Sequence, residues 1–154
     1  MTVRHGLASF ALVLCVAAGA AAQTHGGIRA SISGDPNQFY FGGHIETNPI
    51  VEHLTFRPNV EVGLGNNFTS VDMNFEFAYW IPLRRRIWSA YFGGGPAAII
   101  VSSGAHKPGE DSSRVGGGFN VLLGVQHRRG LFTELKVGVV DSPSVKFTVG
   151  YAMR

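Results

Sequence analysis

One polar segment, residues 104–113, holds the side chains with the clearest potential for catalysis: His106, Glu110, Asp111, Ser112 and Ser113. A histidine, a carboxylate and a serine hydroxyl can together activate a nucleophile for acyl transfer. The same residue types are common in solvated loops, and their spacing here fixes no geometry. A lipid-modifying enzyme is therefore the third of three hypotheses, after two that rest on the remainder of the chain.

Other groups that could bind a metal or a phosphate lack the required spacing. Beyond residue 22, no two histidines share a strand face at the spacing that metal ligands use; they are His25, His44, His53, His106 and His127. The glycine runs at 93–95 and 116–118 lack the Lys-Ser/Thr of a phosphate-binding loop. We therefore expect a protein that is not an enzyme and that uses no cofactor or metal.

The most regular pattern in the chain is TSVDMNFEFAYWIPL, residues 69–83. Apolar Val71, Met73 and Phe75 alternate with polar Asp72 and Asn74, and this period of two predicts a strand with one apolar and one polar face. Turn signals divide the chain beyond residue 22 into about eight such strands. We expect them at residues 27–33, 39–46, 54–65, 69–82, 88–102, 114–126, 131–139 and 145–153.

Consecutive short strands joined by tight turns predict an all-β fold. The expected architecture is a single up-and-down antiparallel eight-stranded β-barrel preceded by a cleaved signal peptide, because closure removes the exposed strand edges. Pro58 and Pro96 fall inside two of the expected strands. Since proline cannot donate a ladder hydrogen bond, each of them predicts a β-bulge.

The first residues have the layout of a secretory signal peptide. Arg4 and His5 precede an apolar run over residues 7–21 that ends in small residues. We place the cleavage between Ala22 and Gln23, which leaves a signal peptide at 1–22 and a β-barrel domain at 23–154. The formal net charge of +3 falls by one when Arg4 leaves, and so small a charge does not indicate a nucleic-acid partner.

The polar faces of the expected strands carry charges of both signs in balance. The interior of an eight-stranded barrel is just wide enough for side chains. A charge buried there without a partner costs on the order of several kcal/mol. The balance therefore predicts an interior polar network of Arg57, Glu61, Asp72, Glu76, Arg114, Glu134 and Lys136.

The opposite strand faces are apolar, and aromatic residues gather near the strand ends. Charged residues make up only 15% of the chain, against about 25% in typical soluble domains. Tyr79, Trp80, Trp88 and Tyr151 lie where a membrane-interface girdle requires aromatic side chains. We interpret the apolar faces as lipid-facing. The second hypothesis turns the same faces inward, in a soluble periplasmic barrel that binds an apolar ligand.

With these features the chain resembles the small eight-stranded outer-membrane β-barrel proteins of Gram-negative bacteria, the OmpA/OmpX-like type. The likeness covers nearly all of residues 23–154. It rests on the signal peptide, the series of hairpins, GGGFNVLLGV (residues 116–125) and SVKFTVGYAM (residues 144–153). The chain departs from that type at its C-terminal end, which reads Tyr-Ala-Met-Arg in place of a terminal Phe or Trp.

The resemblance implies an integral outer-membrane protein with a structural or surface-interaction role, no open pore and both termini in the periplasm. It implies outer-membrane lipid as the surroundings, the barrel-assembly machinery as the partner during insertion, and a monomer. The connections at 47–53, 82–87 and 128–130 would face the periplasm. The longest connection, 103–113, would then lie outside the cell, where long loops are usual in such barrels.

Overall fold

The structure is a computed structural model that describes residues 24–66, 68–83, 87–103, 113–140 and 145–153. The predicted signal peptide and the Ala22–Gln23 cleavage position lie outside these residues, as do His106, Glu110, Asp111 and Ser112. Within the described part of the chain, no helix is long and apolar enough to cross a membrane.

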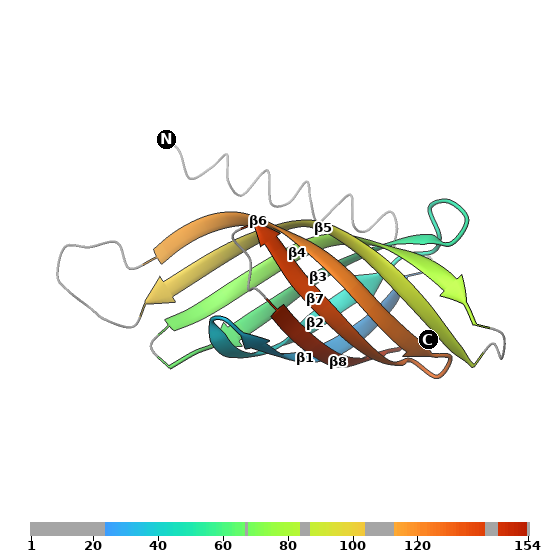
Figure 1. The fold of residues 1–154 in the computed structure, drawn as a ribbon, viewed down its shortest axis with the longest axis horizontal. Coiled ribbons are helices and arrows are strands. Elements are labelled where there is room, and N and C mark those ends of the chain that lie inside the picture. Colours follow the sequence, from blue (N-terminus) through green and yellow to red (C-terminus); the bar gives the residue numbers. More distant parts are fainter. Residues whose placement is uncertain (1–23, 67, 84–86, 104–112, 141–144, 154) are drawn as a thin grey trace.

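Eight antiparallel strands form one closed barrel, in which each strand pairs with the next along the chain and β8 pairs with β1 (Figure 1). The predicted all-β, up-and-down eight-stranded fold is confirmed. The strands are β1 (His25–Gly34), β2 (Asn37–Glu46), β3 (Leu54–Leu64), β4 (Phe68–Pro82), β5 (Trp88–Ser103), β6 (Ser113–His127), β7 (Leu131–Val140) and β8 (Val145–Ala152).

The period of two in the sequence decides which side chains enter the barrel. In β4 the even-numbered Ser70, Asp72, Asn74 and Glu76 are buried. The odd-numbered apolar positions between them point outward, and Phe75 on that face is 42% exposed. Polar residues therefore occupy the inside of the barrel, which is the reverse of a water-soluble barrel with an apolar core.

Neither proline that interrupts a strand produces the predicted bulge. Pro58 pairs with Phe75 in an unbroken β3–β4 register. Pro96 leaves a gap in the β4–β5 pairs, but the register is the same on both sides of the gap. Among the described pairs the register shift falls between β6 and β7, at Phe119/Asn120. Each proline therefore lacks the N–H for one ladder hydrogen bond, but no extra residue is inserted into its strand. The prediction of a β-bulge at Pro58 and Pro96 is wrong.

The barrel wall is taller on one side than on the other. The longest strands are β4, β5 and β6, with 15, 16 and 15 residues, whereas β7 has 10 and β8 has 8. Figure 1 shows β4, β5 and β6 extending beyond the shorter strands β7 and β8 at one end. At the opposite end, the N–H of Met153 donates to the carbonyl of Gly26. The first and last described residues therefore lie together, at the same end as the 47–53 connection.

Candidate functional site: a polar lumen within an apolar wall

Glu134 on β7 is the centre of the largest group of lumen contacts. Its Oε1 lies 2.5 Å from Nη2 of Arg29, which comes from β1. Its Oε2 lies 3.4 Å from Nη1 of Arg57 on β3 and accepts a 3.0 Å hydrogen bond from the Tyr91 hydroxyl on β5. All four residues are buried. One carboxylate therefore joins four strands, and its charge is compensated by two guanidinium groups.

A second group centres on Lys146 of β8. Its Nζ lies 3.1 Å from Oε2 of Glu61 and 3.0 Å from Oδ2 of Asp72. The same ammonium sits 3.5 Å from the ring centroid of Tyr40, a distance suited to a cation–π contact. Ser31 donates a 2.8 Å hydrogen bond to the other oxygen of Glu61. The ammonium is thus held by two carboxylates and an aromatic face.

Between these groups, a chain of amides crosses the lumen. Asn120 donates to Asn74 at 2.7 Å, Asn74 donates to Asn59 at 2.8 Å, and Asn59 donates to Glu76 at 2.8 Å. The chain ends on Lys136, whose Nζ is 2.6 Å from the other oxygen of Glu76. Asn74 and Asn59 each use both a donor and an acceptor, so the chain of hydrogen bonds runs without a break from Asn120 to Glu76.

Aromatic rings fill the lumen near the end that contains residues 47–53. The guanidinium carbon of Arg57 lies 4.6 Å from the ring centroid of Tyr91 and 5.7 Å from that of Trp80. The two rings are 4.6 Å apart, and the indole N–H of Trp80 donates to Thr55 Oγ1 at 2.8 Å. The ring centroid of Phe132 lies 5.2 Å from the same guanidinium carbon. Three aromatic rings therefore surround the Arg57 cation at cation–π distances.

The structure brings six of the seven predicted network residues together as buried lumen side chains: Arg57, Glu61, Asp72, Glu76, Glu134 and Lys136. Arg114 requires a correction, because its side chain is exposed. It has the inward parity of β6 but lies above Phe119, where pairing with β7 ends. At that height no strand of the described residues pairs with β6 on the side of β7. The buried charges are thus four cations and five carboxylates among the described residues.

Three of the four predicted interface aromatics lie on the outside of the wall, with Tyr79 41%, Trp88 40% and Tyr151 46% exposed. Trp80 does not, and its assignment to the interface is corrected. It shares the parity of the buried Glu76 and packs on Tyr91 inside the lumen. The alternation of β4 places Trp80 on the polar face, and its position near the strand end does not change that orientation.

Sequence reasoning missed the large lumen aromatics, and their signal lies in the glycines beside them. A Cβ on Gly124 would stand 2.3 Å from Cζ of Tyr91. A Cβ on Gly150 would stand 2.3 Å from Cζ of Phe132 in the same way. Each ring fills space that a neighbouring inward glycine leaves empty. An inward aromatic residue paired with an inward glycine on the next strand is therefore the pattern that identifies these positions.

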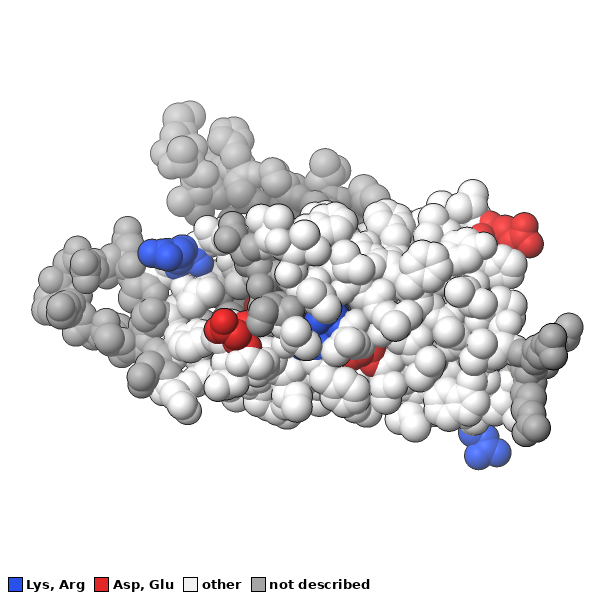
Figure 2. Space-filling view, in the orientation of Figure 1, with Lys and Arg blue, Asp and Glu red and all other residues white. Residues whose placement is uncertain are grey.

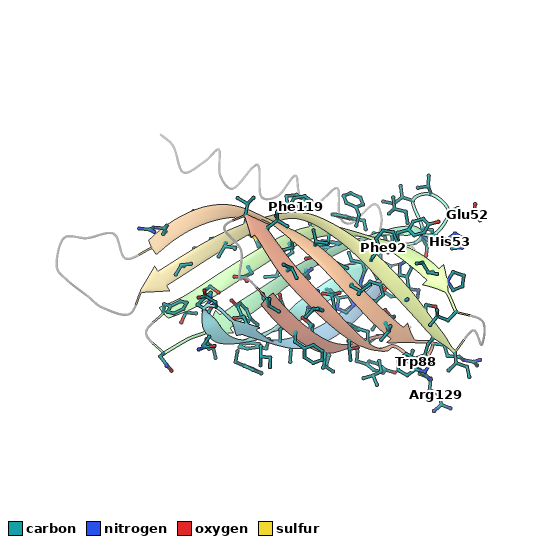
Figure 3. All side chains as sticks on the ribbon, in the orientation of Figure 1. Glu52, His53, Trp88, Phe92, Phe119 and Arg129 are labelled. Atoms are coloured by element: carbon teal, nitrogen blue, oxygen red, sulfur yellow. The ribbon has the colours of Figure 1, made fainter. Side chains whose placement is uncertain are left out.

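The outer surface of the wall is apolar. Phe92 and Phe119, labelled in Figure 3, are 50% and 43% exposed, and Leu123 is 59% exposed. In Figure 2 most of the visible wall is white, charged groups protrude towards its two ends, and a few blue and red atoms are visible between the white side chains near the middle. The hypothesis of an inward apolar face that encloses a ligand is wrong for the described strands, because these side chains point away from the lumen.

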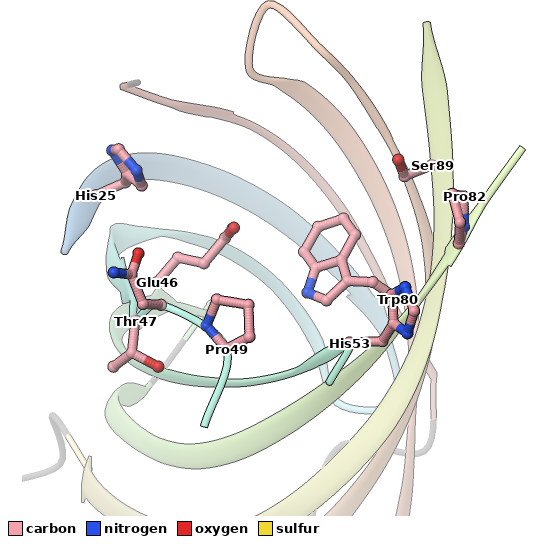
Figure 4. Close-up of a pocket in the computed structure, with 9 residues that line it drawn as sticks. His25, Glu46, Thr47, Pro49, His53, Trp80, Pro82 and Ser89 are labelled. Atoms are coloured by element: carbon pink, nitrogen blue, oxygen red, sulfur yellow. The ribbon is translucent and has the colours of Figure 1, made fainter. Parts of the chain in front are cut away.

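One end of the barrel opens into a cavity of about 350 Å³ (Figure 4). It is lined by His25, Glu46, Thr47, Asn48, Pro49, His53, Trp80, Pro82 and Ser89. Glu46 is 3.7 Å from Nε of Arg57, so the lumen network reaches the floor of this cavity. The described residues contain no group of three or more His, Cys, Asp or Glu side chains placed to hold a metal ion.

Comparison with known proteins supports the architecture at the level of fold. No family model and no curated protein matches the sequence. Among solved structures, the chain is similar to the N-terminal β-barrel domain of Pseudomonas aeruginosa OprF, with a TM-score of 0.60 and 12% sequence identity. The match covers 85% of this chain and 100% of that domain. At this identity the likeness shows a shared barrel fold.

Proposed function

We propose that this chain is an integral outer-membrane β-barrel protein of a Gram-negative envelope, with a structural or surface-interaction role. The observation that carries the proposal is the sidedness of the wall. Charged and amide side chains such as Glu134 and Asn74 are buried in the lumen, while residues such as Leu123 and Phe92 are exposed outside. A wall of this kind is stable in lipid, because a closed barrel satisfies its backbone hydrogen bonds internally.

The height of the wall supports the same proposal. Strand β1 has ten residues and β7 has ten. A ten-residue strand is about 33 Å long. At a tilt of about 40° it rises about 25 Å, which is the height of the apolar band in outer-membrane barrels. Tyr79, Trp88 and Tyr151 then lie near one margin of that band, as aromatic girdles do.

The lumen contacts support a barrel without an open pore. Arg57 on β3 reaches Glu134 on β7, and Lys136 on β7 reaches Glu76 on β4. These pairs span the interior from wall to wall. We therefore propose a non-enzymatic monomer whose surroundings are outer-membrane lipid and whose insertion uses the barrel-assembly machinery. The lipid-modifying hypothesis depends on residues 104–112, which lie outside the described residues, and it stays a prediction.

Membrane fractionation tests this proposal. Cells that express the full chain are lysed, and the membranes are washed with urea. We expect the protein to stay in the membrane pellet and, in unheated SDS samples, to migrate faster than after boiling, because the closed barrel resists the detergent. Recovery of the chain in the soluble periplasmic fraction, with one gel mobility, would refute the proposal.

N-terminal sequencing of the membrane-bound protein tests the proposed signal peptide separately. Cleavage after Ala22 predicts Gln23 as the first residue. A chain that retains residues 1–22 would instead have an uncleaved N-terminal segment, and the proposed domain bounds of 1–22 and 23–154 would be withdrawn. The barrel proposal does not depend on that result.

A further inference from the structure

The cavity at one end of the barrel has a mixed lining that the proposed membrane role does not use. Glu46 is the last residue of β2, and Trp80 and Ser89 come from the adjacent ends of β4 and β5. Figure 4 shows Glu46 and Trp80 extending into the space from opposite sides. Thr47 adds a second hydroxyl to that of Ser89. The described lining thus combines a carboxylate, hydroxyls and an aromatic ring.

Gln126 lies next to this cavity and has an unsatisfied side-chain amide. It is the last inward residue of β6, and it pairs with Ser89 of the cavity lining. Gln126 is 2% exposed, and neither its Oε1 nor its Nε2 has a hydrogen-bond partner in the described chain. Buried amides are nearly always hydrogen-bonded, so this amide indicates a partner from outside the chain. The cavity is the space through which such a partner can reach it.

His44 is a second unsatisfied side chain at this end of the lumen. It lies two residues before Glu46 on the inward face of β2 and is buried, and neither ring nitrogen has a hydrogen-bond partner in the described part of the chain. Its ring meets Phe132 edge-on, with the centroids 5.1 Å apart. Phe132 is also the residue that pairs with Gln126 across the β6–β7 ladder. Unsatisfied polar groups therefore lie on two sides of one ring, behind the cavity.

Trp80 provides a fixed flat surface in the same cavity. Its indole N–H donates to Oγ1 of Thr55 at 2.8 Å, and its ring packs on Tyr91 with the centroids 4.6 Å apart. The side chain is only half-buried, so part of the ring surface faces the cavity. Because the indole is already held in place, a ligand that packs on it does not have to order it.

The hydrogen-bonding groups around the cavity select the class of ligand. A carboxylate only accepts hydrogen bonds, the Gln126 amide donates and accepts, and the Ser89 hydroxyl can do either. An ammonium ligand can only donate and a carboxylate ligand can only accept, whereas each hydroxyl of a ligand does both. A ligand with several hydroxyls therefore matches this lining better than either ion. The Glu46 carboxylate already faces Nε of Arg57 at 3.7 Å, so the ligand does not need a charge.

We propose that the cavity binds a neutral sugar, taken up as one pyranose unit. The C–H face of the sugar ring packs on Trp80, and its hydroxyls exchange hydrogen bonds with Glu46, Ser89 and the Gln126 amide. The cavity volume of about 350 Å³ falls in the range of small-ligand sites. The unit can be a free sugar or the end of a glycan chain, because both present the same ring. The inference goes beyond the proposed membrane residence and does not depend on it.

Tryptophan fluorescence of the full chain tests the proposal. Trp88→Phe leaves Trp80 as the one tryptophan, and the micelles use a detergent without a sugar headgroup, because a glycoside detergent would compete. The probes are the methyl glycosides of glucose, galactose and N-acetylglucosamine. The matched control is 2-(hydroxymethyl)tetrahydropyran, the same ring with one hydroxyl. We expect a saturable change in Trp80 emission with at least one glycoside and none with the control. No change with any glycoside, or an equal change with the control, would overturn the proposal.

The same substitution at the two ends of the barrel locates the binding. Gln126→Leu removes the amide beside the cavity, whereas Gln38→Leu removes a buried amide at the other end of β2 from Glu46. Two lost hydrogen bonds correspond to about a tenfold weaker affinity, which calorimetry measures. We expect that loss for Gln126→Leu and unchanged affinity for Gln38→Leu. Heat-modifiable mobility verifies that both barrels are folded, and equal affinities of the two folded variants would refute the assignment of the site.

Charged and longer sugars define the ligand further. Glucosamine and glucuronate place a cation and an anion on a pyranose ring, and we expect both to bind more weakly than the neutral glycoside. Tighter binding of either one would overturn the assignment of a neutral ligand. A trisaccharide that displaces the glycoside would identify the end of a glycan chain as the ligand, and one that does not displace it would identify a free sugar. Both of these results support a sugar site.

Discussion

Lys146 and Asp72 form an ion pair across the full width of the barrel. Their side chains meet at 3.0 Å, although β8 and β4 lie halfway round the closed ring from each other. Both residues are buried. The contact therefore links two strands that share no backbone hydrogen bonds. Glu134 links further strands across the lumen in the same way. This arrangement leads to five predictions.

Breaking the Lys146 contacts should destabilise the barrel strongly. Lys146→Met leaves Asp72 without its buried cation and weakens the charge balance at Glu61. Removal of one partner of a buried pair costs about 3–5 kcal/mol. We expect a loss of that size in the free energy of unfolding, measured by urea titration in lipid vesicles. In the double variant with Asp72→Asn, the loss should be smaller than the sum of the two single losses, and strict additivity would contradict the ion pair.

Glu134 should contribute more to stability than a lumen residue that makes one hydrogen bond. Glu134→Gln removes the charge that faces Arg29 and Arg57, so about 3–5 kcal/mol should be lost. Tyr91→Phe removes one hydroxyl donor and should cost about 1–2 kcal/mol, because the ring remains in place over Arg57. The same urea titration measures both. Equal losses would show that Glu134 is not the centre of the network.

The glycine beside Tyr91 should not accept a methyl group. Gly124→Ala would bring a Cβ to 2.3 Å from the ring, so the ring or the strand must shift, at a cost of about 1–3 kcal/mol. Gly26→Ala is the matched control, because its Cβ would meet nothing within 4 Å. Thermal unfolding followed by gel mobility should show a lower midpoint for the first variant and little change for the second. The reverse order would contradict the packing.

A charge on the outer wall should be costly only where lipid meets the wall. Leu123 and Val115 both point outward from β6, but Val115 lies beyond Phe119, where the pairing of β6 with β7 ends. Leu123→Arg should cost about 2–4 kcal/mol, the penalty for Arg near the bilayer midplane. Val115→Arg should cost about 0–1 kcal/mol, as at the interface. Similar costs, measured by urea unfolding in vesicles, would show that the wall around Leu123 does not face lipid.

Much of this architecture could be predicted because one period governs it. In β4 the alternation of Asp72, Asn74 and Glu76 with apolar residues fixes the strand, its faces and its part in the network. The interface prediction for Trp80 is wrong because it followed the position of the residue at a strand end. The parity of Trp80 along β4 places its side chain in the lumen. The failure at Arg114 is different in kind, since parity cannot tell how high the neighbouring strand β7 reaches.

The arrangement of the lumen could not be predicted from charge balance alone. Balance indicates that Glu134 needs cations, but it does not select Arg29 and Arg57 from the available ones, because partner choice depends on strand tilt and register. The place of Tyr91 in the lumen depends likewise on the space that Gly124 leaves on the next strand. Such pairs become visible only when the two strands are aligned.

The central claim is that the apolar wall faces lipid and the polar face lies inside, and its two tryptophans test this most directly. Trp88 is 40% exposed on the wall, whereas Trp80 packs on Tyr91 in the lumen. Single-tryptophan proteins, made by Trp80→Phe and Trp88→Phe, are reconstituted into vesicles with brominated lipids, which quench indole fluorescence on contact. The structure predicts strong quenching of Trp88 and little quenching of Trp80. Quenching of Trp80 with Trp88 unaffected, or of neither, would contradict it.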